Sequence, residues 1–150
     1  MIGSRHLTRA SVAGLGVLFA LASIFAACGG SNGGATATAL PSGFTLLSPT
    51  AYRDALAADA GAFVVNVHTP YEGEIARTSA FLAFDRIREG AVDLPADKSA
   101  PLYIYCRSGR MSAEALPALQ ALGYTNVVDL KGGMNAWRDA GLEIVQKPNP

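Results

Sequence analysis

The sequence predicts an α/β domain with a mostly parallel central sheet flanked by helices, spanning residues 44–147. Segments with strand character alternate with segments of helical spacing, and most of the helical segments end at a glycine. The central strand segments are apolar along most of their length, which is typical of parallel strands covered by helices on both faces. About a hundred residues are enough for one hydrophobic core, so a single domain is expected.

The first elements follow directly from the pattern. Residues 44–47 (Phe-Thr-Leu-Leu) form a short apolar segment that predicts a strand. Ser48 and Pro49 are typical of a helix N-cap and a first helical residue, and the helix is expected to end at Gly61. The β-branched run 62–67 predicts a buried strand.

The later elements are predicted in the same way. After a loop, residues 81–84 are expected to form a short strand and residues 85–92 a short helix. The segments 101–105 and 125–130 predict two further buried strands. Helical spacing predicts helices over 112–122 and 134–140, which are followed by Gly123 and Gly141, and Trp137 is expected in the core. Pro117 lies inside the first of these helices and is expected to kink it.

The N-terminal segment has the composition of an export signal. Arg5 and Arg9 lie in a start without acidic residues, and the apolar run 12–27 follows. This run is about 16 residues long, whereas a membrane-spanning helix needs ~20. A basic start, an apolar stretch and small residues at its end predict a secretory signal peptide over residues 1–27.

Phe25-Ala26-Ala27-Cys28 resembles the lipobox of bacterial lipoproteins, with Phe25 where that family prefers leucine. The resemblance implies that Cys28 is lipidated and becomes the new N-terminus. Residues 28–43 are rich in glycine, alanine and threonine and carry no charge, so they are expected to form a flexible tether. The predicted location is therefore extracytoplasmic, with the domain anchored by lipid to the outer face of the cell membrane. Residues 148–150 are taken as a C-terminal tail.

Charge and cysteine usage exclude some classes of function. Both basic residues of the signal segment precede Cys28 and all twelve acidic residues follow it, which leaves a net charge of −2 after Cys28. Such a balance gives no support for nucleic-acid binding, which needs a basic surface. The second cysteine is Cys106, and neither cysteine has metal-ligand spacing or lies near His6 or His68 in sequence, so no metal site is expected.

The chemistry is expected at the junction between strand 101–105 and the helix after it, where ligands bind in parallel α/β sheets. Cys106 stands at the strand end, and the loop Arg107-Ser108-Gly109-Arg110-Met111 follows it. Backbone amides and the helix dipole favour an anion at such a junction, and a nearby arginine favours the thiolate form of a cysteine. The loop therefore combines a nucleophile with a substrate-binding cradle for an anion. The other interpretation is a structural cysteine, which is usually buried among apolar neighbours.

Three stretches resemble the rhodanese-like sulfurtransferase family. Cys106-Arg107-Ser108-Gly109-Arg110-Met111-Ser112 is similar to its active-site loop. Residues 64–72 (Val-Val-Asn-Val-His-Thr-Pro-Tyr-Glu) are similar to an early strand and loop, and residues 123–137, with Gly132-Gly133 and Trp137, to a closing segment. The resemblance covers Phe44 to about Val145 and implies a rhodanese-like fold.

The resemblance also implies an activity. A cysteine thiolate takes sulfane sulfur from thiosulfate or a persulfide, holds it as a persulfide, and passes it to a thiol or to cyanide. The catalytic residue would be Cys106, without a metal or an organic cofactor. The expected partners are a small anionic sulfur donor and a thiophilic acceptor, and a monomer is expected.

Departures from the family pattern leave alternatives open. The family's usual Asp and Arg of the early strand are replaced by Asn66 and His68, which are treated as auxiliary residues. His68 is interpreted as filling a structural position rather than acting as a base, and Glu72 and Glu74 as solvated carboxylates. A rhodanese-fold binding module without turnover is one alternative. A phosphatase is disfavoured because the loop resembles the shorter rhodanese loop and because Ser112 stands where tyrosine phosphatases need arginine.

Overall fold

The computed structural model describes residues 42–147. The predicted signal peptide, Cys28 and nearly all of the predicted tether lie outside the described residues, as do residues 148–150. The elements in chain order are β1 (Phe44–Leu47), α1 (Pro49–Ala58), β2 (Phe63–Asn66), β3 (Glu74–Ile75), β4 (Ala80–Phe81), η1 (Phe84–Arg86), η2 (Ala91–Asp93), β5 (Leu102–Tyr105), α2 (Arg110–Ala121), β6 (Val127–Leu130), α3 (Gly133–Asp139) and β7 (Ile144–Val145).

Five strands form the predicted parallel sheet in the order β1-β6-β5-β2-β4. Every neighbouring pair in it is parallel. The register places Asn66 opposite Tyr105 and Ile104 opposite Asp129, so the carboxyl ends of β2, β5 and β6 lie together at one edge. Residues that follow these three strands therefore meet at that edge.

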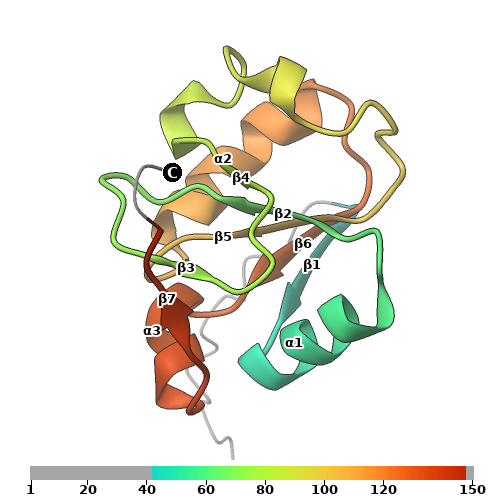
Figure 1. Cartoon of the computed structure of the whole chain (residues 1–150). Helices are drawn as coiled ribbons and strands as arrows, with labels where there is room; N and C mark the ends of the chain where they lie inside the picture. Colours follow the sequence, from blue (N-terminus) through green and yellow to red (C-terminus); the bar gives the residue numbers. More distant parts are fainter. Residues whose placement is uncertain (1–41, 148–150) are drawn as a thin grey trace, which may run out of the picture. The chain divides into compact units, whose positions relative to one another are not determined.

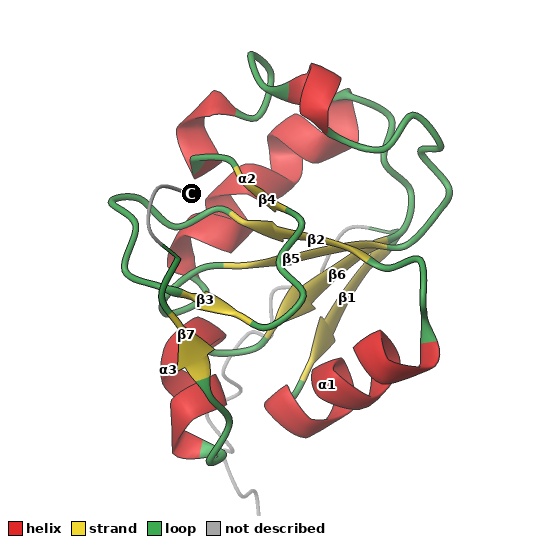
Figure 2. Cartoon of the chain, in the orientation of Figure 1, coloured by secondary structure: helices red, strands yellow, loops and turns green. Residues whose placement is uncertain are grey.

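Helical segments cover both faces of the sheet, as the apolar strands predict. Figures 1 and 2 show α1 and α3 on one side, and α2 with the 3-10 turns η1 and η2 on the other. The buried side chains form two clusters, one per face. The cluster under α2 includes Val65, Ile104 and Leu119, and the cluster under α1 and α3 includes Tyr52 and Trp137. The core position predicted for Trp137 is confirmed.

The predicted start of α1 is confirmed. Ser48 is the N-cap, its hydroxyl accepts a hydrogen bond from the amide of Ala51 over 3.4 Å, and Pro49 is the first helical residue. The helix ends at Ala58, before the predicted stop at Gly61, because Asp59 is already extended. Helix α2 runs as one element through Pro117, which has no amide hydrogen to donate to the preceding turn.

The region between β2 and β5 differs in detail from the prediction. Strand β4 covers only Ala80–Phe81, and the amides of Leu82 and Phe84 donate to the carbonyls of Asn66 and Val67 over 3.0 Å each. The chain thus continues along β2 without regular pairing. The helix predicted over 85–92 is wrong: two short 3-10 turns form instead, with the conformationally costly Gly90 between them.

The small antiparallel pair of β3 and β7 was not predicted. Its register places Glu74 opposite Val145 and Ile75 opposite Ile144. The interpretation of Glu74 as a solvated carboxylate is wrong, because this residue is only 2% exposed. It forms an ion pair with Lys147, and the hydroxyl of Tyr71 lies 3.5 Å from it. Closure of the chain end over the 71–78 loop buries the carboxylate.

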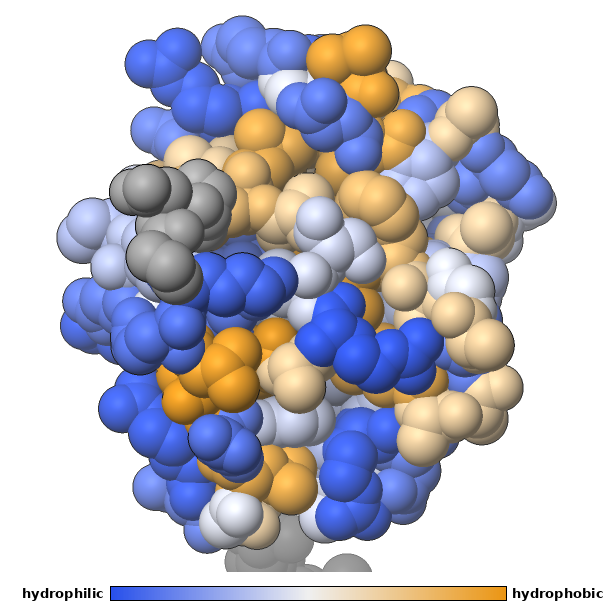
Figure 3. All heavy atoms as spheres, in the orientation of Figure 1, coloured by the Kyte–Doolittle hydropathy of each residue, from blue (hydrophilic) through white to orange (hydrophobic). Residues whose placement is uncertain are grey.

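The face of the molecule shown in Figure 3 is mixed in polarity. On the face shown in Figure 3, hydrophobic residues occur in small groups between hydrophilic ones. Within residues 42–147, none of the helices has both the length and the apolar character that crossing a membrane requires.

Candidate active site

Cys106 lies at the carboxyl end of β5, directly before the turn that leads into α2. The thiol is almost completely buried, with 1% of the residue exposed. Gly109 adopts a positive φ of 93° before the first residue of α2, a conformation that favours glycine. This turn brings the amide of Gly109 to 3.0 Å from Sγ of Cys106, where it donates a hydrogen bond to the sulfur.

Helix α3 holds the loop from behind. The amides of Met134 and Asn135 donate to the carbonyls of Cys106 and Arg107, over 2.9 Å each. Gly133 allows this approach: its φ is +58°, and a Cβ at this position would overlap the Cys106 carbonyl and lie 2.7 Å from the Arg107 carbonyl carbon. The Gly132-Gly133 pair of the closing segment therefore fixes the loop through its backbone.

The loop amides are left available. Within the described residues, the amides of Arg107, Ser108, Arg110 and Met111 have no protein acceptor. This is expected for Arg110 and Met111, which lie in the first turn of α2. Amides at such a turn, together with the helix dipole, stabilise an anion. The loop can therefore support a thiolate, or a persulfide anion extending from Cys106.

The rim beside the sulfur holds charged and apolar groups. Nη1 of Arg107 donates to both carboxylate oxygens of Glu72, over 3.0 and 3.1 Å. Nε2 of His68 lies 3.3 Å from the same carboxylate, without the alignment of a hydrogen bond, and its Nδ1 lies 3.2 Å from Sδ of Met111. Arg107, followed by His68, lowers the pKa of Glu72. Arg107, the arginine that directly follows Cys106, is therefore already paired with Glu72.

The five loop residues 107–111 do not all contribute to the rim, because some lie on the exposed surface of α2. Arg110 forms an ion pair with Glu114 one turn along α2, and both side chains are largely exposed. Ser108 is also exposed, whereas Met111 is half-buried beside His68. Of the two arginines expected in the cradle, the structure brings Arg107 to the rim with His68 and pairs Arg110 with Glu114 on the helix surface.

Asn66 braces the loop after β2 with neutral hydrogen bonds. Its Oδ1 accepts from the amide of His68 over 3.0 Å, and its Nδ2 donates to the carbonyl of Gly73 over 3.0 Å. The peptide bond between Thr69 and Pro70 in this loop is cis. In the described part of the chain, neither Asn66 nor His68 forms a hydrogen bond with Cys106, and their hydrogen bonds and contacts lie within the 66–73 loop and with Met111 and Glu72.

The sequence did not point to a polar connection beneath the sulfur. Sγ of Cys106 lies 3.8 Å from Oγ of Ser112, which in turn lies 2.9 Å from Oδ2 of Asp129. Asp129 is 6% exposed, and burial raises its pKa from 3.8 to about 7, opposed by the hydrogen bond from Ser112 and by the nearby amide of Leu130. A single acidic residue in the otherwise apolar strand Val127–Leu130 was the signal that could have indicated it.

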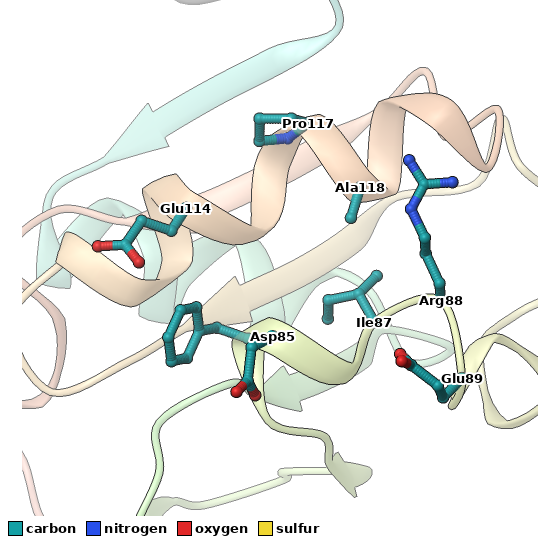
Figure 4. Close-up of a pocket in the computed structure, with 8 residues that line it drawn as sticks. Asp85, Ile87, Arg88, Glu89, Glu114, Pro117 and Ala118 are labelled. Atoms are coloured by element: carbon teal, nitrogen blue, oxygen red, sulfur yellow. The ribbon is translucent and has the colours of Figure 1, made fainter.

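Other chemistry finds less support in the described residues. Residues 42–147 contain no group of three or more side chains suited to hold a metal ion. A hollow of about 390 Å³ lies between η1 and α2, where Glu114, Pro117 and Ala118 form its helical wall (Figure 4). Cys106 and its loop do not line this hollow. The candidate site is formed by the groups around the thiol.

A family comparison agrees with this geometry. The profile of the rhodanese-like domain matches residues 60–140, more than half of the chain. This segment contains the β2 loop, Cys106 with its loop, and the Gly132-Gly133 turn.

Individual relatives are more distant. A probable adenylyltransferase/sulfurtransferase MoeZ of Mycobacterium tuberculosis is 33% identical over 95 residues, which are 61% of this chain and 24% of that protein. A sulfurtransferase of Allochromatium vinosum is 43% identical over 53 residues, 35% of this chain and 48% of that protein. The chain thus matches between a quarter and about half of the length of these curated relatives.

Solved structures share the fold. A rhodanese-related protein from Thermoplasma volcanium superposes with a TM-score of 0.57 and 26% identity, covering 69% of this chain and 99% of that one. A rhodanese-like domain protein from Staphylococcus aureus gives the same TM-score and coverage at 27% identity. The superposed part of this chain therefore spans nearly the whole of both solved chains.

Proposed function

The chain belongs to the rhodanese-like domain family, and from that premise we propose that it is a sulfurtransferase carrying sulfane sulfur as a persulfide on Cys106. The observation that supports this most directly is the hydrogen bond from the Gly109 amide to Sγ of Cys106. An amide aimed at the sulfur, with further unpaired amides beside it, stabilises a thiolate before the reaction and a persulfide anion after it. The sulfurtransferase names of two relatives are consistent with this activity.

The proposed cycle is a double displacement. The Cys106 thiolate attacks the sulfane sulfur of thiosulfate, a Cys106 S–S bond forms, the donor S–S bond breaks, and sulfite leaves with its electron pair. An acceptor nucleophile then attacks the outer sulfur and restores the thiolate. Cyanide leaves as thiocyanate in this step, whereas a thiol leaves as a persulfide. A persulfide donor enters the same cycle with a thiolate as its leaving group.

In the proposed cycle, the rim receives the anionic donor through Arg107. Arg107 is half-exposed and reaches Glu72, so a donor anion can replace this carboxylate as the partner of the guanidinium. The thiol of Cys106, the residue that precedes Arg107, is buried. Arg107 is therefore proposed to bind the donor, and Glu72 to hold the guanidinium at the rim between turnovers.

The location proposed from the N-terminal sequence accompanies this activity. Lipidation at Cys28 would anchor the domain to the outer face of the cell membrane, with residues 29–43 as the tether. Fractionation of cells that express the whole chain tests it. The protein should be in the membrane fraction with a lipid-modified Cys28, and the Cys28→Ser variant should be released.

The activity is tested by thiocyanate formation from thiosulfate and cyanide. Cys106→Ser should abolish turnover, because the hydroxyl cannot form a persulfide. Glu114→Gln, on the exposed face of α2, is the matched control and should retain turnover. If both variants turn over like the unaltered protein, Cys106 does not carry the sulfur.

A further inference from the structure

Asp129 is a buried carboxyl with one unpaired oxygen. Its Oδ2 is hydrogen-bonded to Ser112, whereas Oδ1 has no partner among the described residues. An ionised carboxylate in such a place loses its hydration without full compensation. The protonated form is buried at a much lower cost, and the raised pKa agrees with that preference. Asp129 is therefore a favourable site for a proton, and it is connected to Cys106 through Ser112 by two hydrogen bonds.

Among the residues that the structure describes, no cation contributes to the raised pKa of Asp129. From α2 it is faced by the hydroxyl of Ser112, and from β1 by Leu46, its register partner. From α1 the titratable group is the phenol of Tyr52, which donates to the Ile104 carbonyl over 3.2 Å, and burial raises its pKa well above the usual value. From the end of β5, the titratable group is Cys106, which is reached through Ser112.

The hydroxyl of Ser112 has one hydrogen and three neighbouring acceptors. Oγ lies 2.9 Å from Asp129, 3.1 Å from the Gly109 carbonyl and 3.8 Å from Sγ of Cys106. When Asp129 is ionised, the hydroxyl donates to the carboxylate, the strongest acceptor, and accepts from the thiol. When Asp129 is protonated, the acid donates to Oγ, and the hydroxyl is free to donate to the thiolate. The direction of the hydrogen bonds between Asp129, Ser112 and Cys106 therefore depends on which group holds the proton.

We propose that Cys106 and Asp129 share one proton through Ser112, which makes Asp129 a positioning residue for the nucleophile. The thiol with an ionised carboxylate converts to the thiolate with a carboxylic acid: an S–H bond breaks, an O–H bond forms, and no redox partner is needed. The proposal deepens the proposed function, because it concerns the same cysteine. In the thiolate form, the sulfur accepts from both Gly109 and Ser112.

The test is the pH profile of Cys106 alkylation by iodoacetamide, which needs no sulfur donor. The full chain is used, and tryptic peptide 99–107, which contains Cys106, is quantified between about pH 5 and pH 10. Two coupled groups lose their protons in two steps, so the rate should rise in two steps. Asp129→Asn should lose the lower step. Ser112→Ala should bring the steps together, and Glu114→Gln should keep both.

Asp129→Asn retains the shape of the side chain, and a melting curve at each pH shows whether it is folded. If Asp129 had only a structural role, Asp129→Asn would change the alkylation rate by the same factor at all pH values, and the number of steps would stay the same. A single step in the unaltered protein, or two steps in Asp129→Asn, would overturn the shared proton. Either result leaves persulfide formation untouched, because sulfur transfer is measured separately.

Discussion

The backbone of Gly133 lies against the carbonyl of Cys106, which also accepts a hydrogen bond from the amide of Met134 over 2.9 Å. A side chain at Gly133 would overlap this carbonyl. We expect Gly133→Ala to displace the Cys106 loop, slow sulfur transfer severely and destabilise the domain by about 3 kcal/mol from strain and overpacking. Thiocyanate formation and denaturant unfolding measure the two effects.

Gly141 is the control for Gly133. Its φ is +74°, but nothing lies within 4 Å of a Cβ built there. Gly141→Ala should therefore cost about 1 kcal/mol of backbone strain and leave the activity unchanged. Equal losses of activity in the two variants would show that strain, not contact with the loop, explains the effect.

Glu72 is expected to compete with an anionic donor. Glu72→Gln removes a negative charge from the rim and releases Arg107 from its partner. The value of kcat/KM for thiosulfate should rise several-fold at low ionic strength, and the gain should diminish as salt screens the charges. Asp54→Asn, on the exposed face of α1, removes a remote carboxylate and should change nothing. A loss of activity in Glu72→Gln would instead mean that the Arg107 pair organises the site.

Asp129 should make stability depend on pH. The carboxyl ionises with a pKa of 3.8 when unfolded and about 7 when folded, so between these values the folded state holds one more proton. The free energy of unfolding therefore falls as pH rises through this window, by roughly 4 kcal/mol at most. Asp129→Asn should remove the dependence and be more stable than the unaltered protein at pH 8, measured by urea unfolding.

Asp97 provides a contrast of opposite sign. Hydrogen bonds from Ser99 lower its pKa, so its ionised form stabilises the folded state above its unfolded pKa. Asp97→Asn should lower stability at pH 8. If both Asn variants shift stability in the same direction, the burial of Asp129 does not govern its titration.

The ion pair between Glu74 and Lys147 should stabilise the chain end. Lys147→Met would leave the buried carboxylate without its cation and destabilise the domain by about 2 kcal/mol, less than for a fully buried pair because Lys147 is half-exposed. The double variant with Glu74→Gln should recover part of the loss. An unchanged melting temperature in Lys147→Met would show that the pair contributes nothing.

The sequence predicted the parallel sheet because its strands are apolar on both faces. This apolar pattern is already visible in short segments such as 101–105 and 125–130. The pair of β3 and β7 could not be predicted, because each strand has two residues and pairing depends on the chain end returning to the 74–75 segment. The burial of Glu74 follows from the same contact.

The candidate site was only partly predictable. The position of Cys106 follows from the strand-to-helix junction, which is a local feature. The connection to Asp129 depends on the register of β6 beside β5, and the outward pairing of Arg110 on the helical position of Glu114. The connection to Asp129 cannot be read from spacing along the chain, because it arises from how α2 lies on the sheet, whereas the pair of Arg110 and Glu114 has the i,i+4 spacing of a helical ion pair.

The central claim is that Cys106 carries sulfane sulfur, and an intact-mass measurement tests it most directly. The protein is treated with thiosulfate, then with cyanide, and compared with Cys106→Ser. The account predicts a gain of one sulfur atom that cyanide removes and that Cys106→Ser does not show. No added sulfur from thiosulfate or a polysulfide, in protein whose Cys106 is still free to alkylate, would contradict it and favour a binding module.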